Sequence, residues 1–315
     1  MPKPLISVIM PAFNAAEYMA ESIDTVICQT FTDWELIVIN DGSTDDTEAI
    51  AHKYVAADAR IKLINQTNKK LSAARNAGIQ AATGPWIAFL DADDLWMPEK
   101  LALQIQSANT CPQAGVIFTD GYVFQTNNTT NTLPYGTVAG YYSGSEMYRL
   151  EYQGNYIPVL SVLVKKELLD TIGLQDEQLT ACQDWDYWLR LAANGAGFYG
   201  LSEKLFYYRR HASNMSNDSS LMVFEQACVF IKNFKRGLFT STDLAKLKSF
   251  LNITICNLIR AGEMDKAIFL NRQQSQIRNK AINSLSNFFM NLLGERSYLL
   301  VRLIFKADTL LSKNA

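Results

Sequence analysis

The 315-residue sequence has few cysteines, only two histidines and no long hydrophobic run. Its five cysteines are widely spaced and form no Cys-X-X-Cys pair, which argues against a disulfide framework and a zinc site and favours a reducing compartment. Without an apolar segment of about 20 residues, we expect no membrane-spanning helix. The start, Met1-Pro2-Lys3-Pro4, has no hydrophobic leader region, so we expect no signal peptide and a cytoplasmic location.

The apolar content, 48% of the residues, is enough for a substantial core. The formal net charge of −2 conceals an asymmetry, because residues 1–211 carry −9 and residues 212–315 carry +7. An acidic front part suits a metal-dependent catalytic domain. A basic end suits an anionic surface such as a lipid headgroup layer, but ordinary solvated helix faces would give the same composition. Both interpretations of the basic end stay open.

Apolar strands and amphipathic helices alternate four times over the first 110 residues, which predicts a mostly parallel sheet covered on both faces. The expected strands are residues 5–10, 35–40, 61–64 and 86–90, and the expected helices are residues 15–29, a segment capped by Thr44, residues 71–82 and a segment opened by Pro98.

The pattern is less regular after residue 110. The expected elements there are strands at 116–124, 160–164 and 198–208, an exposed Asn- and Thr-rich loop at 125–132, and a helix at 184–193. From residue 219 onward the pattern is helical only. We therefore expect a catalytic domain over residues 1–215, with a nucleotide-binding half (1–110) and an acceptor-binding half (111–215), followed by a helical region over 216–315.

Three carboxylates, Asp91, Asp93 and Asp94, directly follow the apolar strand at 86–90. A buried strand that ends on acids delivers them to the carboxyl edge of a sheet, where open α/β folds bind ligands. Like charges packed this closely repel one another. A hard divalent cation carrying a diphosphate would relieve that repulsion.

Six motifs stand in a fixed order along the chain: Ser7–Asn14, Val38–Thr47, Leu71–Gly78, Phe89–Asp94, Gln183–Leu191 and Tyr208–His211. Together they resemble the family 2 glycosyltransferases, which are inverting enzymes that use nucleotide-sugar donors. The resemblance covers about residues 5–215. It implies the GT-A fold, with a mixed and mostly parallel central sheet, and a bacterial-type role in cell-surface polysaccharide biosynthesis.

The resemblance implies a set of donor-binding residues in the first half: Pro11, Ala12, Phe13, Asn14, Asp41, Lys70, Arg75, Asp91, Ala92 and Asp93. Asp41 would accept a hydrogen bond from a pyrimidine N3–H, although Asp-Gly is also a common turn pair. Arg75 could contact the phosphates or ribose of the donor, or pair with a surface acid. Lys69-Lys70 replaces a frequent Gly-Gly, and Phe13 replaces a frequent Tyr.

Asp91, Ala92 and Asp93 match the DxD signature of the family. By this resemblance Asp93 ligates Mn²⁺ or Mg²⁺ on the diphosphate, and Asp91 faces the ribose or a metal-bound water. His211 is a further candidate for contact with the metal or the diphosphate. Carboxylates are the hard oxygen ligands that these ions require. We expect Asp94 to cap the next element or to hold the loop.

Asp184 matches the general base of the family. It would deprotonate the acceptor hydroxyl as the oxygen attacks the anomeric carbon in line. Its position at a helix start also fits an N-cap. Asp186 should face elsewhere. Trp185 and Trp188 could stack on sugar rings or pack in the core, and packing is favoured for Trp188.

These features predict transfer of a sugar, most simply UDP-linked, to a hydroxyl of a glycan or lipid-linked glycan, with residues 125–140 closing over the donor. A sugar-nucleotide nucleotidyltransferase would show a Gly-rich basic loop where Pro11–Asn14 stands. An inactive scaffold would lack the metal or base carboxylate, and both are present.

We expect no nucleic-acid partner. The apolar and basic C-terminal helices either form a packed hairpin or touch the inner membrane face.

Overall fold

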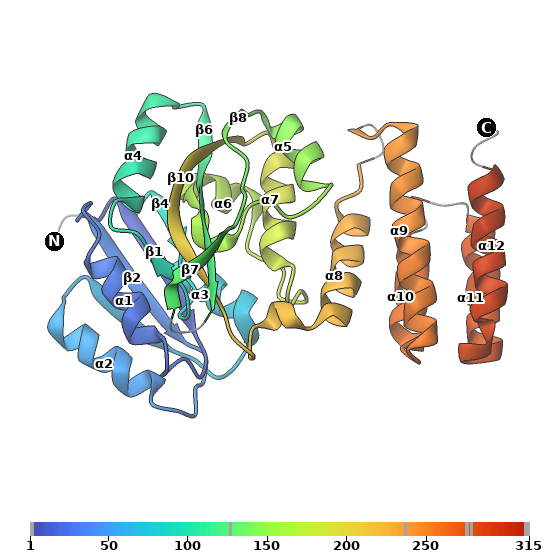
Figure 1. Ribbon diagram of the computed structural model, residues 1–315, viewed down its shortest axis with the longest axis horizontal. Coiled ribbons are helices and arrows are strands. Elements are labelled where there is room, and N and C mark those ends of the chain that lie inside the picture. Colours follow the sequence, from blue (N-terminus) through green and yellow to red (C-terminus); the bar gives the residue numbers. More distant parts are fainter. Residues whose placement is uncertain (1–2, 126–127, 236–237, 275–276, 278–279, 312–315) are drawn as a thin grey trace. The chain divides into compact units, whose positions relative to one another are not determined.

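A computed structural model of the protein describes residues 3–125, 128–235, 238–274, 277 and 280–311. Its internal contacts divide the chain into two units, Met1–Asn217 and Asp218–Ala315. The first unit combines a sheet with helices, and the second is built of helices (Figure 1). The α/β fold class and the helical C-terminal region predicted from the sequence are confirmed.

The first unit is organised around one sheet, which in the described part of the chain has ten strands in the order β3-β2-β1-β4-β9-β6-β10-β5, with β7 added to β6 and β8 added to β10. The strands are β1 Ile6–Ala12, β2 Trp34–Asn40, β3 Ile61–Asn65, β4 Trp86–Phe89, β5 Leu95–Trp96, β6 Ala114–Gln125, β7 Asn128–Pro134, β8 Gly140–Tyr142, β9 Leu163–Lys165 and β10 Gly197–Arg210. The helices are α1 Met19–Ile27, α2 Thr47–Ala57, α3 Lys70–Ala81, α4 Lys100–Thr110, α5 Gly144–Glu151, α6 Lys166–Ile172 and α7 Gln183–Ala193.

Helices cover both faces of the parallel half of the sheet, because side chains alternate between the faces along each strand. Val8 and Met10 of β1 belong to the same buried cluster as Ile23 of α1. Ile9 points to the opposite face, where a Cβ added to Gly78 of α3 would lie 2.4 Å from its side chain. A larger residue at position 78 would therefore displace the helix that carries Arg75.

The sheet changes character after β4. Strands β1 to β4 pair in parallel as predicted, whereas β9 runs antiparallel to both β4 and β6 and joins the two halves. The prediction of an exposed loop at 125–132 is wrong for its larger part, because β7 pairs antiparallel with β6. Residues 126–127 lie outside the described residues. Asn and Thr dominate this segment, and β-branched Thr favours an extended backbone. Polarity alone did not distinguish a polar strand from a loop.

The second unit consists of α8 Ser219–Lys232, α9 Ser241–Arg260, α10 Met264–Gln273, α11 Lys280–Leu293, the short 3₁₀ helix Gly294–Ser297 and α12 Tyr298–Leu311. Leu251 and Ile255 of α9 and Val301 of α12 are fully buried within it. Among the described helices of the chain, none combines the length and the hydropathy needed to cross a bilayer.

Glu35 ties the amino ends of the central strands together. Its buried carboxylate accepts hydrogen bonds from Ser7 Oγ at 2.6 Å, from Lys62 Nζ at 2.6 Å, and from the Thr83 backbone N–H and hydroxyl at 2.8 and 2.7 Å. Burial raises the pKa of Glu35, but these hydrogen bonds outweigh it and lower the pKa to about 2, against an ordinary 4.5. The ionised form therefore stabilises the fold.

Replacing Glu35 with Gln should destabilise the first unit. Because the pKa of Glu35 is lowered on folding, its stabilisation is complete above pH 4.5 and is lost as the pH falls toward 2. We expect Glu35→Gln to lower the free energy of unfolding at neutral pH by about 2 kcal/mol. Urea denaturation across this pH range measures the effect. The exposed Asp33→Asn is the control, and equal stability of the two variants would contradict the assignment.

Candidate active site

The carboxyl ends of β1, β2 and β4 bring the predicted donor-binding segments to one edge of the sheet. Ala12, the last residue of β1, lies opposite Asn40, the last residue of β2, and the Asp41 N–H donates to the Ala12 carbonyl at 2.9 Å. Residues 91–94 begin two residues after the end of β4, which also pairs with β1. The acidic cluster and the two predicted nucleoside turns therefore share this edge, as the alternating pattern predicts.

The two nucleoside turns are bonded to each other through Asn14. Its backbone is left-handed, with φ of 49°. Its N–H donates to Ser43 Oγ at 3.0 Å, and its side-chain oxygen accepts from the Thr44 N–H at 2.8 Å. Thr44 therefore bonds to this turn. The prediction that Thr44 caps the following helix is wrong, because α2 begins at Thr47. The neighbouring Phe13 ring is 51% exposed, so a face of it is open to a flat ligand.

Asp41 anchors the segment that leads into α3. Its buried Oδ1 accepts from Gln66 Nε2 at 2.7 Å and from the Lys69 N–H at 2.8 Å. Lys70, the next residue, has a φ of +72°, a conformation that a glycine adopts without strain. The resemblance described above implies a Gly-Gly at positions 69 and 70 in many members, and glycine would adopt this backbone more easily than Lys70 does. Strain of this kind is typical of ligand-binding segments.

Arg75 and Asp91 form a buried ion pair. Nη2 of Arg75 lies 2.7 and 2.9 Å from the two carboxylate oxygens of Asp91, and Arg75 is only 1% exposed. Its Nε and Nη1 atoms are buried, and they have no hydrogen-bond partner among the described residues. Unsatisfied buried donors are rare, so this pair offers two donors to an anionic or hydroxylated ligand. Of the two roles predicted for Arg75, the structure shows the pairing with an acid, Asp91, whose side chain is 25% exposed; the contact with the donor stays a prediction.

Asp93 lies against His211, with 2.9 Å between Oδ2 and Nε2. Burial and the charge of Asp91 raise the pKa of Asp93, and His211 opposes this shift. The described residues contain no cluster of three or more His, Cys, Asp or Glu arranged to hold a metal ion. A carboxylate oxygen beside an imidazole nitrogen nevertheless fits a Mn²⁺ or Mg²⁺ site that takes its other ligands from a diphosphate and water.

Asp94 fastens the acidic loop to β10. It is fully buried, and its Oδ1 accepts from the Arg209 N–H at 2.8 Å, while Arg209 Nε donates to the Asp93 carbonyl at 2.6 Å. Burial raises the pKa of Asp94 well above its ordinary value, and Asp93 and Asp91 add to the shift. Of the two roles expected for Asp94, the structure gives it that of holding the loop.

Asp184 lies in the first turn of α7, but it is not the cap, because Cys182 occupies that position. Its carboxylate accepts from Asn155 Nδ2 at 3.3 Å and from the Trp185 N–H at 2.7 Å. Burial raises the pKa of Asp184, whereas the charge of Arg75 lowers it and the charge of Asp91 raises it. The segment that leads into α7 packs on α3, the helix of Arg75, because Ser72 Oγ donates to the Leu179 carbonyl and Asn76 Nδ2 to the Gln175 carbonyl, both at 3.0 Å. Asp184 therefore follows a segment that contacts the helix carrying Arg75.

The neighbours of Asp184 on α7 face away from this site. Asp186 is fully buried and bonded to Arg190 at 2.9 Å, as expected. Trp185 and Trp188 are also buried, and their indole N–H groups donate to the carbonyls of Glu151 and Ile157. Both rings pack in the core, so neither is available to stack on a sugar.

Two residues that the sequence did not single out contact parts of this site. Asn155, in the segment after α5, is the amide donor to Asp184. Tyr135 packs its ring on Phe206 and Tyr208, and burial followed by the charge of Asp184 raises its pKa. Neither residue stands in a recognisable motif, and no local signal reveals a contact made across the fold.

A family model for glycosyl transferase family 2 matches residues 7–171. The chain belongs to glycosyltransferase family 2. It is 32% identical over 219 residues to the putative teichuronic acid biosynthesis glycosyltransferase TuaG of Bacillus subtilis, an alignment covering 69% of this chain and 83% of TuaG. It is also 32% identical over 242 residues to the putative glycosyltransferase EpsE of the same organism, covering 73% and 84% of the two chains. This chain is therefore a glycosyltransferase, as predicted.

Solved structures support the fold of this family 2 glycosyltransferase. Residues 1–349 of S. aureus TarS in complex with UDP-GlcNAc superpose with a TM-score of 0.64 at 17% identity, covering 96% of this chain and 90% of that one. The mannosyltransferase PcManGT from Pyrobaculum calidifontis, in complex with GDP-Man and Mn²⁺, gives a TM-score of 0.59 at 15% identity, covering 99% and 87%. The predicted GT-A fold is confirmed by these likenesses.

Proposed function

We propose that this glycosyltransferase transfers a sugar from a nucleoside diphosphate donor to a hydroxyl group of a glycan or lipid-linked glycan, with inversion at the anomeric carbon. The observation that supports the proposal is the buried Arg75, which pairs with Asp91 and keeps two donors without a partner among the described residues, on a helix that contacts the segment leading to Asp184. Asp91 pairs with the Arg75 guanidinium, whose Nε and Nη1 donors have no hydrogen-bond partner among the described residues. Asp184 would act as the base. The name of the relative TuaG favours a polysaccharide product.

The donor would lie along the carboxyl edge of the sheet. A nucleobase would stack on the open face of Phe13, and the buried Asp41 carboxylate would accept a base N–H. Arg75 would donate from Nε and Nη1 to the phosphates or ribose, with Lys70 nearby. UDP is the simplest nucleotide for this site, because a uracil N3–H matches a carboxylate acceptor. A guanine N1–H would match it too, so a panel of nucleotide sugars decides the point.

The chemical step would be an in-line displacement. An acceptor hydroxyl gives its proton to Asp184 as its oxygen forms a bond to the anomeric carbon, and the bond from that carbon to the diphosphate oxygen breaks. The nucleoside diphosphate leaves with the electron pair. A Mn²⁺ or Mg²⁺ ion held by Asp93, with His211 as a second ligand and Asp91 nearby, would neutralise charge on the departing diphosphate.

In the segment predicted to close over the donor, residues 125–140, the part from Tyr135 to Thr137 is hydrogen-bonded to β6. Asp120 accepts from the N–H groups of Gly136 and Thr137 at 3.0 and 3.1 Å and pairs with Lys204 at 2.6 Å. The Tyr135 N–H donates to the Gly121 carbonyl at 2.9 Å. Any closure over the donor would therefore involve the β6–β7 hairpin ahead of residue 135.

The cellular setting is also a proposal. All five cysteines lie in the described residues and are free, and three of them, Cys111, Cys182 and Cys256, are buried. Free thiols are usual in a reducing compartment, so we propose a cytoplasmic enzyme.

Replacing Asp184 with Asn tests the base. Asn keeps the shape and the hydrogen bond from Asn155 but cannot accept the proton. We expect turnover, measured as release of nucleoside diphosphate, to fall by about 10³-fold, a typical contribution of general-base catalysis. Donor affinity, measured by calorimetry, should change less than about twofold. Asp170→Asn, an exposed carboxylate on α6, is the control, and retained turnover in Asp184→Asn would remove Asp184 as the base.

Replacing Asp93 with Asn tests the metal ligand. In the presence of Mn²⁺, donor affinity should fall by about tenfold or more, because a neutral amide is a weak ligand for a hard cation. In the presence of a chelator, wild type and variant should bind the donor alike, since the lost contact runs through the ion. Equal stimulation of both proteins by Mn²⁺ would eliminate Asp93 from this role.

Removing the amide of Asn155 should change the pH dependence of the reaction. The hydrogen bond from Asn155 lowers the pKa of Asp184, so its loss in Asn155→Ala raises that pKa. Because the base acts when ionised, the acidic limb of the rate profile should move to higher pH while the plateau at alkaline pH is kept. Asn194→Ala, at the other end of α7, is the control. An unmoved limb would show that Asn155 does not tune the base.

A further inference from the structure

Helices α11 and α12 present an apolar face that the second unit does not bury. The exposed side chains of this face are Leu285 (45% exposed), Phe288 (58%), Leu292 (63%), Leu299 (67%) and Leu303 (63%). We call these five residues the apolar face. Their spacings of three, four and seven residues place them on one side of each helix.

The opposite sides of the same helices are packed. Met290 of α11 and Val301 and Phe305 of α12 are each no more than 2% exposed. Packing between the helices of the second unit therefore accounts for these three side chains. This packing does not account for the apolar face, and large exposed apolar side chains in a row along a helix are typical of an interaction surface.

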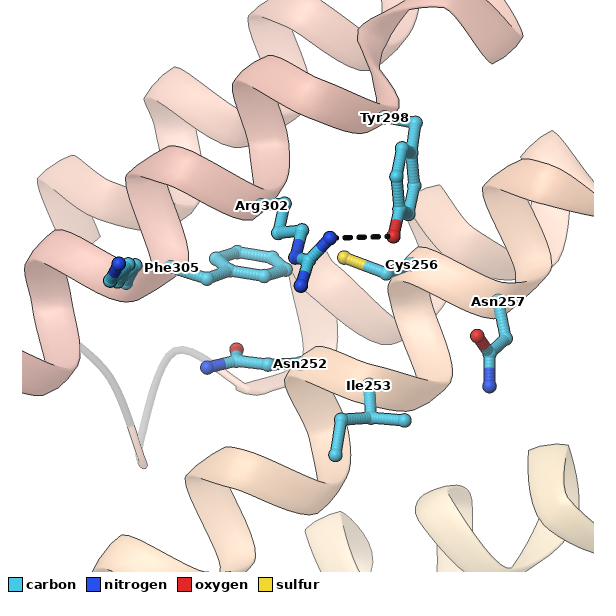
Figure 2. Close-up of a pocket in the computed structure, with 8 residues that line it drawn as sticks. Asn252, Ile253, Cys256, Asn257, Tyr298, Arg302 and Phe305 are labelled. Atoms are coloured by element: carbon cyan, nitrogen blue, oxygen red, sulfur yellow. Dashed lines mark hydrogen bonds between the residues drawn. The ribbon is translucent and has the colours of Figure 1, made fainter.

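A cationic cavity adjoins the apolar face. It has a volume of about 290 Å³ and lies between α9 and α12, with Asn252, Asn257, Tyr298, Arg302 and Lys306 among its lining residues (Figure 2). Arg302 Nη1 donates to the Tyr298 hydroxyl at 3.4 Å. No carboxylate lines the cavity in the described part of the chain, so its cations are available to an anion.

The cations and the apolar face lie together on α12. Arg302 and Lys306 are one and three residues from Leu303, and both are exposed. By helical spacing they flank Leu299 and Leu303 on the side that borders the cavity. The second unit as a whole, residues 218–315, has 14 Lys and Arg against 7 Asp and Glu. An apolar strip flanked by cations suits a lipid surface, where leucines enter the acyl boundary and cations meet headgroup phosphates.

A second copy of the chain fits this surface less well. A two-fold contact presents the same patch from both partners, so it would bring Arg302 and Lys306 of one copy towards those of the other. Like charges brought together in this way oppose such a contact. Charge complementarity thus favours an anionic surface over self-association.

We propose that the apolar face, with Arg302 and Lys306 beside it, docks on a membrane surface that carries anionic lipid headgroups. This inference goes beyond the sugar transfer proposed above and does not depend on it. The helices would lie in the interface and hold the enzyme on the membrane without crossing it.

Vesicle co-sedimentation of the full chain tests the proposal. The wild type should bind phosphatidylcholine vesicles that contain phosphatidylglycerol, bind pure phosphatidylcholine weakly, and lose binding as salt is raised. Arg302→Glu/Lys306→Glu should weaken binding to the anionic vesicles by about tenfold or more. Leu299→Ser/Leu303→Ser should weaken it as well, even at low salt.

Matched variants control for charge and hydropathy. Lys3→Glu/Lys53→Glu makes the same charge change on exposed lysines of the first unit, and Leu133→Ser removes a leucine that is 70% exposed. Both should bind as the wild type does. Circular dichroism melts check folding, and the salt dependence of the wild type is a test that needs no variant.

Four outcomes would overturn the proposal. The wild type could fail to bind anionic vesicles, or the Arg302/Lys306 and Leu299/Leu303 variants could bind as their controls do. Sedimentation velocity could show a dimer that Leu299→Ser/Leu303→Ser dissociates while vesicles are ignored, which would assign the apolar face to self-association. Binding of inorganic phosphate without vesicle binding would reduce the cavity to a site for free anions.

Discussion

Three acidic side chains within four residues, at the end of a buried strand, impose the constraint on which this active site depends. Asp91, Asp93 and Asp94 cannot share that space as anions unless positive or donating groups surround them. The structure provides a separate partner for each: the Arg75 guanidinium, the His211 imidazole and the Arg209 N–H. These partners come from α3, from the end of β10 and from the residue after it, so the repulsion is balanced only when the whole first unit is folded.

Arg75 also links the two parts of the proposed reaction, which are the binding of the donor and the removal of the acceptor proton. Arg75 pairs with Asp91 through a single nitrogen and keeps two buried donors for a ligand, and its charge also acts on Asp184. A diphosphate that took up those donors would weaken the field of Arg75 at Asp184. The carboxylate would then hold a proton more strongly, which is what a base needs once the donor is bound. Donor binding and base strength would be coupled through one guanidinium.

The sequence predicted those parts of the site that local pattern controls. An apolar strand followed by acids located Asp91 and Asp93 at the sheet edge, and the alternation of elements predicted the parallel half of the fold. The sequence did not reveal Asn155, Tyr135 or strand β7, because each depends on contacts between distant segments. Cap assignments were wrong for the same reason: Thr44 bonds to Asn14 across the turn, and Cys182 rather than Asp184 precedes α7.

The opposite charges of the two parts of the chain suit the two different ligands proposed for them. A front part with a net charge of −9 over residues 1–211 repels diphosphates and anionic membranes at long range, so Arg75 can attract a donor only at close contact within the site. The same front part gains nothing from an anionic surface. A lipid-linked acceptor would nevertheless have to be met at such a surface, and the +7 over residues 212–315 would supply the attraction that the catalytic part lacks. Under the two proposals made above, segregating the charges in this way would let one polypeptide hold a cation-dependent acidic site and still approach an anionic membrane.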